Sequence, residues 1–278
     1  EVGDIVRVEV EPEKFGRIAA QTARQVIIQR LKDAERQIIY EEFSDKIGDL
    51  INGVVFKSED DQVLVRLNDR TEAILPREER IVGESYALGS RMKFFLVEVR
   101  QTTRGPKIIV SRSHPGLLRK LLELEIPEVR EGTIEIREIV RESGVRAKVA
   151  VSTLDPNVDP VGACIGNAGA RIKSISKELG GERIDVVVWS SDPLIFIRNA
   201  LSPARVLKVE PVLEQERAVQ VFVRPDHLSL AIGKAGQNVR LAARLTKWKI
   251  DIKVLEPEKL PTLQDLFDEL INTEEVES

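Results

Sequence analysis

The chain has 278 residues, of which 42% are apolar and 32% charged, and its net charge is −4. Its length predicts two or three domains, and its composition is that of a folded, soluble protein. No apolar run approaches the ~18 residues that span a bilayer, so no membrane or secretion signal is predicted. The single cysteine, Cys164, suits a reducing cytosol, and a start at Glu1 without Met predicts a fragment or a processed product.

The charges are unevenly distributed along the chain. Residues 113–256 carry three more basic than acidic side chains, whereas residues 257–278 carry six more acidic than basic ones. The acidic overall balance therefore does not exclude a polyanionic partner for the basic segment.

The first 40 residues predict a short strand followed by a long helix. Val6, Val8 and Val10 alternate with other residues ahead of Pro12, which is typical of a strand that ends at a proline. Residues 15–37 contain no proline, and their apolar residues recur at three- and four-residue spacing, which predicts an amphipathic helix. Its opposite face is basic and is interpreted either as solvent-exposed or as a contact for an acidic partner, through Arg17, Arg24, Arg30 and Arg36.

Residues 41–112 predict a small β-barrel. Turn sequences separate five short runs rich in β-branched and aromatic residues, at 50–56, 63–67, 72–75, 92–99 and 107–110. Five strands in about 70 residues suit an OB-type barrel, a fold that often holds single-stranded nucleic acid. Residues 61–66 contain no aromatic residue for base stacking, so we expect weak binding that depends on the remaining candidates, Arg66, Arg70, Arg77, Arg91, Lys93 and Phe94.

Residues 113–256 predict a duplicated α-β-β-α-α-β unit. In the first copy, helices are expected at 117–125, 161–165 and 170–179, with strands at 133–141, 145–152 and 183–189. In the second copy, helices are expected at 194–200, 228–232 and 237–245, with strands at 205–213, 218–224 and 248–255. Each copy has Ile-Gly-x-x-Gly between its second and third helices, and the two motifs lie 67 residues apart.

The repeated Gly-x-x-Gly turn is suited to gripping a phosphate backbone. Glycine lacks a Cβ, so the turn can adopt positive φ and a phosphate can approach the main chain, while N–H groups of the next helix face the anion. Apolar neighbours, Ile165 with Ile172 and Ile232 with Val239, would wall a groove for unstacked bases. One such turn is common as a plain helix connection, whereas two in matching surroundings favour RNA binding.

The duplicated unit resembles a pair of KH domains, and the barrel resembles the S-one RNA-binding module of ribosomal proteins. The order of the parts and the sequences at 15–23, 155–162 and 228–233 resemble the NusA family of bacterial transcription factors over nearly all of residues 1–256. The resemblance implies an N-terminal part that docks on RNA polymerase, and a barrel and KH pair that hold single-stranded nascent RNA. It implies a role in pausing, termination and antitermination, with other antitermination factors as further partners.

The expected fold class is multidomain α+β, with a five-stranded OB-type barrel followed by two tandem KH domains. The expected parts are the end of an N-terminal polymerase-binding domain with its connecting helix, an S-one-type barrel, the first KH domain, the second KH domain and an acidic amphipathic tail, at residues 1–40, 41–112, 113–189, 190–256 and 257–278.

The expected RNA contacts lie in the two turns, in the helices that follow them and on the barrel. Lys234 is expected to approach a phosphate, and polar side chains within two helical turns of the loops are interpreted as further phosphate contacts. The set comprises Gly166, Asn167, Ala168, Gly169, Arg171 and Lys173 in the first copy, Gly233, Lys234, Ala235, Gly236, Gln237, Asn238, Arg240 and Arg244 in the second, and Arg66 and Arg91 on the barrel.

An enzymatic function is not predicted. Gly233-Lys234 lacks the GxxxxGK[ST] phosphate loop, residues 162–169 lack GxGxxG, and His114 and His227 have no metal-ligand spacing. We therefore expect no catalytic residue, no metal and no cofactor, together with a cytoplasmic location and no membrane partner. Cys164 is expected to be a core residue, and Trp189 and Trp248 are expected to pack in the core or between domains.

Two alternative functions remain open. A general RNA chaperone or ribosome-associated factor would bind RNA by the same mechanism, and only a polymerase-binding test separates it. Phosphorolytic exoribonucleases also carry KH and S-one modules, although they usually place one KH domain before the barrel, whereas here the barrel comes first.

The acidic tail predicts an amphipathic helix that begins near Thr262. Its apolar residues follow helical spacing, at Leu263, Leu266, Phe267, Leu270 and Ile271. This helix is interpreted either as a terminal helix packed on the second KH unit or as a docking or autoinhibitory helix that competes with RNA for basic residues.

Overall fold

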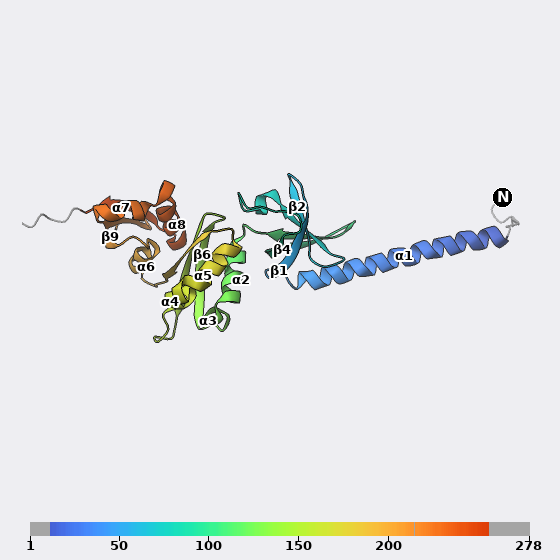
Figure 1. The fold of residues 1–278 in the computed structure, drawn as a ribbon, viewed down its shortest axis with the longest axis horizontal. Helices are drawn as coiled ribbons and strands as arrows, with labels where there is room; N and C mark the ends of the chain where they lie inside the picture. The colour runs from blue at the N-terminus through green and yellow to red at the C-terminus, as the bar shows by residue number, and fades with distance from the viewer. Residues whose placement is uncertain (1–11, 214, 256–278) are drawn as a thin grey trace, which may run out of the picture. The chain divides into compact units, whose positions relative to one another are not determined.

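The computed structural model describes residues 12–213 and 215–255, which divide into two compact units that meet in sequence between Leu121 and Leu122 (Figure 1). The strand expected before Pro12 and the helix expected after Thr262 lie outside the described residues. Within the described part of the chain, no helix is both long enough and apolar enough to cross a membrane.

The first unit begins with a helix that is longer than the sequence pattern predicts. Helix α1 spans Pro12–Ser44 and does not stop at residue 37. Its last turns belong to the barrel, because Phe43 is 4% exposed within the barrel core and Ile39 and Tyr40 pack against that core. The expected boundary at residue 40 therefore falls inside a continuous helix.

Five strands form the closed barrel that the sequence predicts. They lie in the order β1-β2-β3-β5-β4, with bounds Leu50–Ser58 (β1), Gln62–Arg66 (β2), Glu72–Pro76 (β3), Arg91–Thr102 (β4) and Gly105–Ser111 (β5). Buried side chains alternate along β2 and β3. In β1, a Cβ on Gly53 would lie 2.2 Å from Cγ1 of Val65. Phe94 is fully buried in this core, so the expectation that it contacts nucleic acid is wrong.

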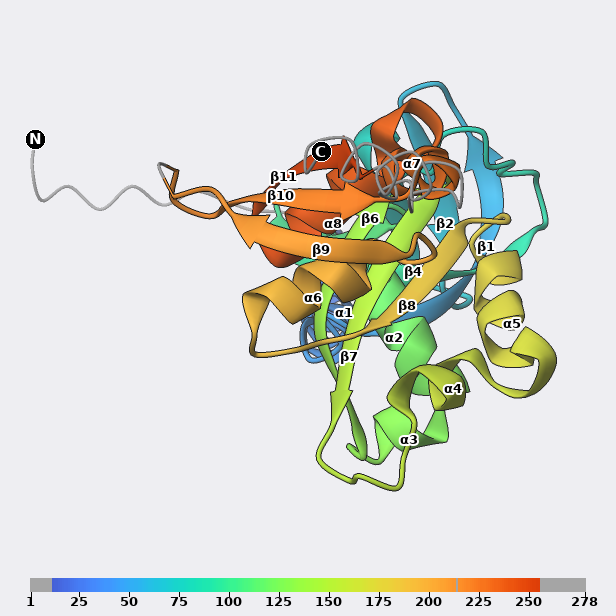
Figure 2. The ribbon, with the colours of Figure 1, turned by 90° about the vertical axis from the view of Figure 1, so that its left-hand side faces the viewer.

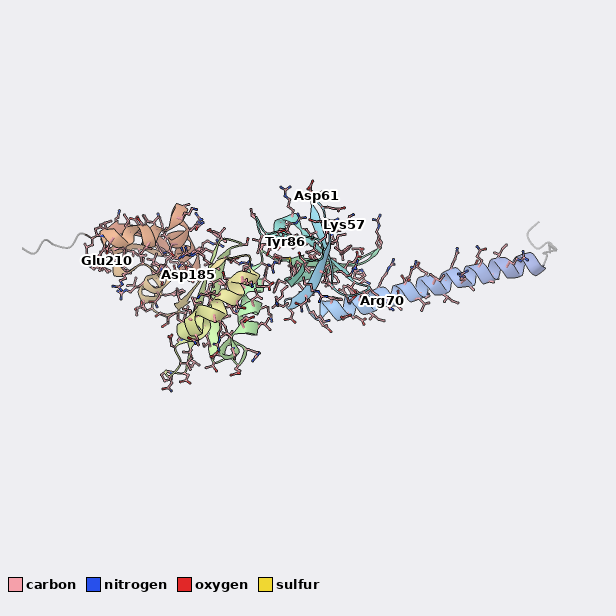
Figure 3. All side chains as sticks on the ribbon, in the orientation of Figure 1. Lys57, Asp61, Arg70, Tyr86, Asp185 and Glu210 are labelled. Carbon is pink, nitrogen blue, oxygen red and sulfur yellow. The ribbon has the colours of Figure 1, made fainter. Side chains whose placement is uncertain are left out.

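A buried polar network holds the loop between β3 and β4, which begins with the 3-10 turn η1 (Arg77–Glu79). The buried Arg112 guanidinium donates to the Glu84 carboxylate and, at 2.7 Å, to the carbonyl oxygen of Lys93. The Tyr86 hydroxyl also donates to Glu84, at 2.7 Å; Tyr86 is labelled in Figure 3. Because these buried groups are paired, they stabilise the loop on the barrel.

The second unit contains both copies of the duplicated unit, and both have the same topology. Helix α2 (Pro115–Glu125) precedes them. The first copy comprises α3 (Pro127–Arg130), β6 (Ile134–Glu142), β7 (Arg146–Thr153), α4 (Pro160–Ile165), α5 (Ala170–Glu178) and β8 (Arg183–Val188). The second comprises α6 (Pro193–Ala200), β9 (Val206–Pro211), β10 (Ala218–Val223), α7 (Pro225–Ile232), α8 (Gln237–Thr246) and β11 (Lys249–Val254). In each sheet the central strand is antiparallel to the strand before it and parallel to the strand that follows α5 or α8.

One hydrophobic core serves both copies. Val140, Ala150 and Val187 of the first sheet belong to the same buried cluster as Ile197 of α6 and Leu241 of α8. The first six residues of β7 are all buried, so both faces of this strand are covered. Helices α4 and α5 of its own copy contact the first sheet, and so do α6 and α8 of the second copy (Figure 2). The tryptophans pack as expected, since Trp189 and Trp248 both lie against this core.

Buried charges brace the same region. Arg141 and Glu182 form an ion pair in which both side chains are at most 1% exposed. Lys148, fully buried on β7, donates to Asp185 at 3.0 Å and to the carbonyl oxygen of Ser202, in the second copy, at 2.8 Å. The two copies are therefore joined by polar as well as apolar contacts.

Candidate nucleic-acid interface

The two Gly-x-x-Gly turns adopt the same backbone conformation. Gly166 and Gly233 have φ/ψ of 73°/175° and 77°/171°, and the central alanines, Ala168 and Ala235, have φ of 50° and 51°. The fourth residues, Gly169 and Gly236, have φ of 77° and 73°. In both turns, the first, third and fourth residues therefore have positive φ. Positive φ is uncommon for residues other than glycine, so its repetition at both alanines is unusual.

The first glycine of each turn is sterically required. A Cβ on Gly166 would lie 2.8 Å from Cγ of Arg171, and a Cβ on Gly233 would lie 2.8 Å from Cβ of Asn238. Arg171 and Asn238 occupy the same position in the two copies. The side chain at this position therefore packs directly against the first glycine of the turn.

The turns present main-chain donors at two helix N-termini. Helices α5 and α8 begin immediately after the turns, and their N-cap residues, Gly169 and Gly236, provide no side-chain hydrogen bond. The first-turn N–H groups of a helix lack partners within the helix and carry its positive dipole end. Within the turns, the N–H groups of Gly169 and Ala170, and those of Gly236 and Gln237, already donate to turn carbonyl oxygens. The candidate donors for an anion are therefore the N–H groups of the exposed middle residues of each turn and of the next residues in each helix.

Apolar side chains flank each turn at equivalent places. Ile165 is 37% exposed and Ile232 is 38% exposed, which is unusual for isoleucine. Ile172 and Val239, on the following helices, are half-buried. Both copies therefore pair a main-chain anion site with an apolar surface of the kind on which unstacked bases lie.

The basic residues of the first copy brace their own turn. The Arg171 guanidinium donates to Glu128 at 2.9 Å and to the carbonyl oxygen of Ala163 at 2.7 Å, and it is 32% exposed. Lys173 donates to the carbonyl oxygen of Ala168 at 2.8 Å and is exposed. Both side chains lie near the turn, as the sequence predicts, and their hydrogen bonds to main-chain carbonyl oxygens also stabilise its conformation.

The second copy presents fewer of its predicted contacts. Lys234 and Arg244 are exposed and Gln237 is half-buried. Asn238 is fully buried, and its Nδ2 donates to the carbonyl oxygens of Leu201, Leu230 and Ala231 at 3.0–3.2 Å. Asn238 is therefore a structural residue, and its predicted RNA contact is wrong because no part of it reaches the surface.

Arg240 is engaged by a carboxylate of the first copy. Its Nε donates to Oε1 of Glu142 at 2.8 Å, and its Nη2 donates to Oε2 at 3.1 Å. The guanidinium hydrogen bonds lower the pKa of Glu142, so this carboxylate is charged at neutral pH. The side chain remains half-exposed but already has an anionic partner.

The barrel brings its two predicted contacts to one face. Arg66 on β2 and Arg91 on β4 both pair in register with Val54 of β1, so they flank that strand on the same outer surface. Arg66 also lies over the Phe56 ring, 4.9 Å from its centroid. The barrel thus has an aromatic residue beside Arg66, on the neighbouring strand β1 and not within residues 61–66.

Sequence reasoning missed a basic groove between α1 and the barrel. The groove has a volume of about 550 Å³, and its charged lining comprises four cationic side chains, Arg36, Arg70, Arg104 and Lys107, and one acidic side chain, Glu72. Leu64 of β2 and Ile74 of β3 add apolar lining; Arg70 is labelled in Figure 3. Arg36 lies in the predicted part of α1, and it reaches Arg104 because the helix continues past residue 37 into the barrel.

Nothing in the described part of the chain suggests a metal or a reactive thiol. The described residues contain no cluster of three or more His, Cys, Asp or Glu side chains that could hold a metal ion. Cys164 is 1% exposed, and burial raises its thiol pKa to about 11, which confirms the expectation of a core residue.

Three family models match parts of this chain on either side of the barrel. Residues 112–189 match the family model for a NusA-like first KH domain, residues 193–259 match a NusA-like second KH domain, and residues 1–37 match the NusA N-terminal domain.

Full-length relatives agree over most of this chain. The transcription termination/antitermination protein NusA of Bacillus subtilis is 53% identical over 252 residues, which cover 91% of this chain and 67% of that protein. The protein of the same name from Thermus thermophilus is 48% identical over 257 residues, or 92% of this chain and 66% of that protein. Its Mycobacterium tuberculosis counterpart is 46% identical over 249 residues, or 87% and 72%. This chain, which spans about two thirds of the length of these relatives, belongs to the NusA family of transcription termination/antitermination proteins.

Proposed function

We propose that this chain grips single-stranded nascent RNA with both Gly-x-x-Gly turns and thereby modulates transcriptional pausing, termination and antitermination in the bacterial cytoplasm. The observation that carries the proposal is the near-identical conformation of the two turns, each followed by a helix N-terminus without a side-chain cap and flanked by an exposed isoleucine. Phosphate oxygens can accept hydrogen bonds from such donors whatever the base sequence, and unstacked bases can lie on the apolar flank.

The proposed contacts are the accessible members of the predicted set. The main chain of both turns contacts phosphates, with Lys234 as the charged member of the second turn and Arg244 beside it. Arg171 and Lys173 shape the first turn and add positive charge near it. On the barrel, Arg66, Arg91 and the basic groove are proposed as further RNA contacts.

Two weak grips in one body favour tight binding to longer RNA. Each KH module holds about four nucleotides. Because the two copies share one core, binding at the first turn places the RNA near the second at a high effective concentration. The N-terminal segment is proposed to dock on RNA polymerase, with other antitermination factors as further partners.

The substitutions Ala168→Asp and Ala235→Asp test the grip. Each places a carboxylate on a turn where a phosphate should lie, so we expect each variant to lose most of its affinity for a single-stranded RNA of about a dozen nucleotides. Ser191→Asp adds the same charge at an exposed site outside both turns and is the matched control. Unchanged affinity in both turn variants, measured by fluorescence anisotropy at two salt concentrations, would contradict the proposal.

A polymerase-binding experiment separates the transcription factor from a general RNA chaperone. The proposal predicts retention of the chain on immobilised RNA polymerase from which the nascent RNA has been removed, because the N-terminal segment is proposed to dock on the enzyme. Ala168→Asp and Ala235→Asp combined should leave this RNA-independent retention intact. RNA binding without retention on RNA-free polymerase would favour the chaperone.

A further inference from the structure

Arg240 links the second turn to the first copy. Besides its two hydrogen bonds to Glu142, at the end of β6, its Nη1 donates at 3.4 Å to the carbonyl oxygen of Ala235 in the turn. One guanidinium therefore contacts both the residue that ends a strand of the first sheet and the main chain of the second Gly-x-x-Gly turn. Arginine can do this because its five donors form a planar fork.

The first copy has a different residue at the same position. Lys173 precedes Arg240 by the 67-residue offset of the motifs, and its ammonium donates to the equivalent turn carbonyl, that of Ala168. A lysine suffices there because the turn is fixed within its own copy. The second copy has an arginine where the same contact must also reach a carboxylate on another sheet, and a lysine cannot make the paired hydrogen bonds.

A second ion pair follows the same route. Lys247, just beyond the end of α8, donates to Glu138 on β6 at 3.1 Å, and it is 68% exposed. The two ion pairs therefore connect α8 and the residue just after it to two positions on β6, Glu142 and Glu138. The Arg240 pair is the better protected of the two, since the Glu142 side chain is 20% exposed.

We propose that Arg240 is a positioning residue, which fixes the second turn against β6 so that one RNA fits both turns, and that it is not a phosphate contact. This inference rests on the proposed function. The two roles predict opposite effects of Glu142→Gln. A positioning role predicts weaker binding because the bidentate pair is broken, whereas a phosphate role predicts tighter binding because a competing carboxylate is removed.

The first test compares RNAs of two lengths. For an RNA long enough to span both turns, we expect Glu142→Gln and Arg240→Lys each to lower affinity about threefold to tenfold, with an unchanged salt dependence. For an RNA that occupies the first turn alone, we expect no change. Because Arg244 also interacts with Glu142, this comparison is made in an Arg244→Gln background. Tighter binding by Glu142→Gln there, with a salt slope steeper by about one, would show that Arg240 contacts phosphate and would overturn the proposal.

Charge reversal provides the matched control. Arg240→Glu should weaken binding of the long RNA further, and the double variant with Glu142→Arg should recover most of the loss because the pair is restored in reverse. Lys208→Glu reverses a charge whose partner, Glu210, lies on the same strand, so it should leave the length dependence unchanged; Glu210 is labelled in Figure 3. A double variant no better than Arg240→Glu alone would contradict positioning.

A measurement without RNA separates this inference from the proposed function. Spin labels at Lys234→Cys in the turn and Glu135→Cys on β6 report the distance between them, while the buried Cys164 stays unlabelled. We expect Arg240→Ala to broaden the distance distribution, and an unchanged distribution would overturn positioning even if RNA binds. If Arg240→Ala broadens the distribution but Ala235→Asp leaves RNA affinity unchanged, the positioning role is supported. The proposed grip of the second turn on RNA is then refuted.

Discussion

Asn238 provides the most quantitative prediction about the second turn. Its buried amide has two N–H groups that serve three carbonyl oxygens, those of Leu201, Leu230 and Ala231. Asn238→Ala removes the two N–H donors of the amide, although the carbonyl oxygen of Leu201 still accepts from the Ala204 N–H. At about 1 kcal/mol for each bond, with a further cost for buried groups left unpaired, we expect a loss of about 2–4 kcal/mol in the free energy of unfolding. That is a large fraction of the about 5–15 kcal/mol that stabilises a domain.

The assay is urea denaturation followed by tryptophan fluorescence. Both tryptophans of the chain, Trp189 and Trp248, lie in the second unit, so the signal reports that unit alone. Asn238→Asp should be more destabilising than Asn238→Ala, because a carboxylate would face three carbonyl oxygens. Gln237→Ala, at the neighbouring half-buried position, should change stability by less than about 0.5 kcal/mol. A similarly small change for Asn238→Ala would refute the structural role assigned to this residue.

Three further predictions concern the turns and the core. Gly166→Ala and Gly233→Ala should each destabilise the second unit by about 1–3 kcal/mol in the same assay, because a Cβ there meets both positive φ and a neighbouring side chain. Glu142 has a pKa lowered by its hydrogen bonds to Arg240, so the folded protein binds the carboxyl proton less readily than the unfolded chain. The pair's contribution should be complete above the ordinary glutamate pKa of about 4.3 and be lost as the pH falls below it, measured as the stability difference between parent and Glu142→Gln; a difference that grows on acidification would contradict this. Cys164, with a pKa of about 11, should react with a maleimide at pH 7 only after urea unfolds the protein, and rapid labelling of the folded chain would show that it is accessible.

The duplicated unit was predictable because both of its signals are local. Alternating and helical apolar spacing identify the strands and helices, and glycines are the residues that tolerate positive φ. The structure confirms the barrel, the two sheets and the helices on either side of each turn. It adds the short helix α3, whose one turn is too brief to leave an apolar period.

The misassigned residue of α8 did leave a signal in the sequence. The buried face of α8 consists of Asn238, Leu241, Ala242 and Leu245, which follow i, i+3, i+4, i+7 spacing. Asn238 therefore lies on the apolar stripe of the helix, where its Nδ2 is satisfied by main-chain carbonyl oxygens and its buried Oδ1 has no hydrogen-bond partner among the described residues. Its position one residue after the start of α8 favours an RNA contact, whereas its spacing relative to Leu241, Ala242 and Leu245 predicts burial.

Features that depend on tertiary packing could not be predicted from the sequence. No periodicity predicts that Arg240 meets Glu142, since they belong to different copies and are 98 residues apart. The barrel groove likewise needs Arg36 of α1 beside Arg104 and Lys107 of the β4–β5 hairpin. Such pairings follow from how sheets and helices pack, which a single sequence does not specify.

The central claim is that both Gly-x-x-Gly turns hold one RNA, and amide chemical shifts test it most directly. An isotope-labelled sample titrated with single-stranded RNA of about a dozen nucleotides would reveal which main-chain N–H groups meet phosphates. The account predicts the largest shifts at residues 167–171 and 234–237, with both turns responding to the same addition of RNA. Shifts confined to the barrel, or to one turn at saturating RNA, would contradict it.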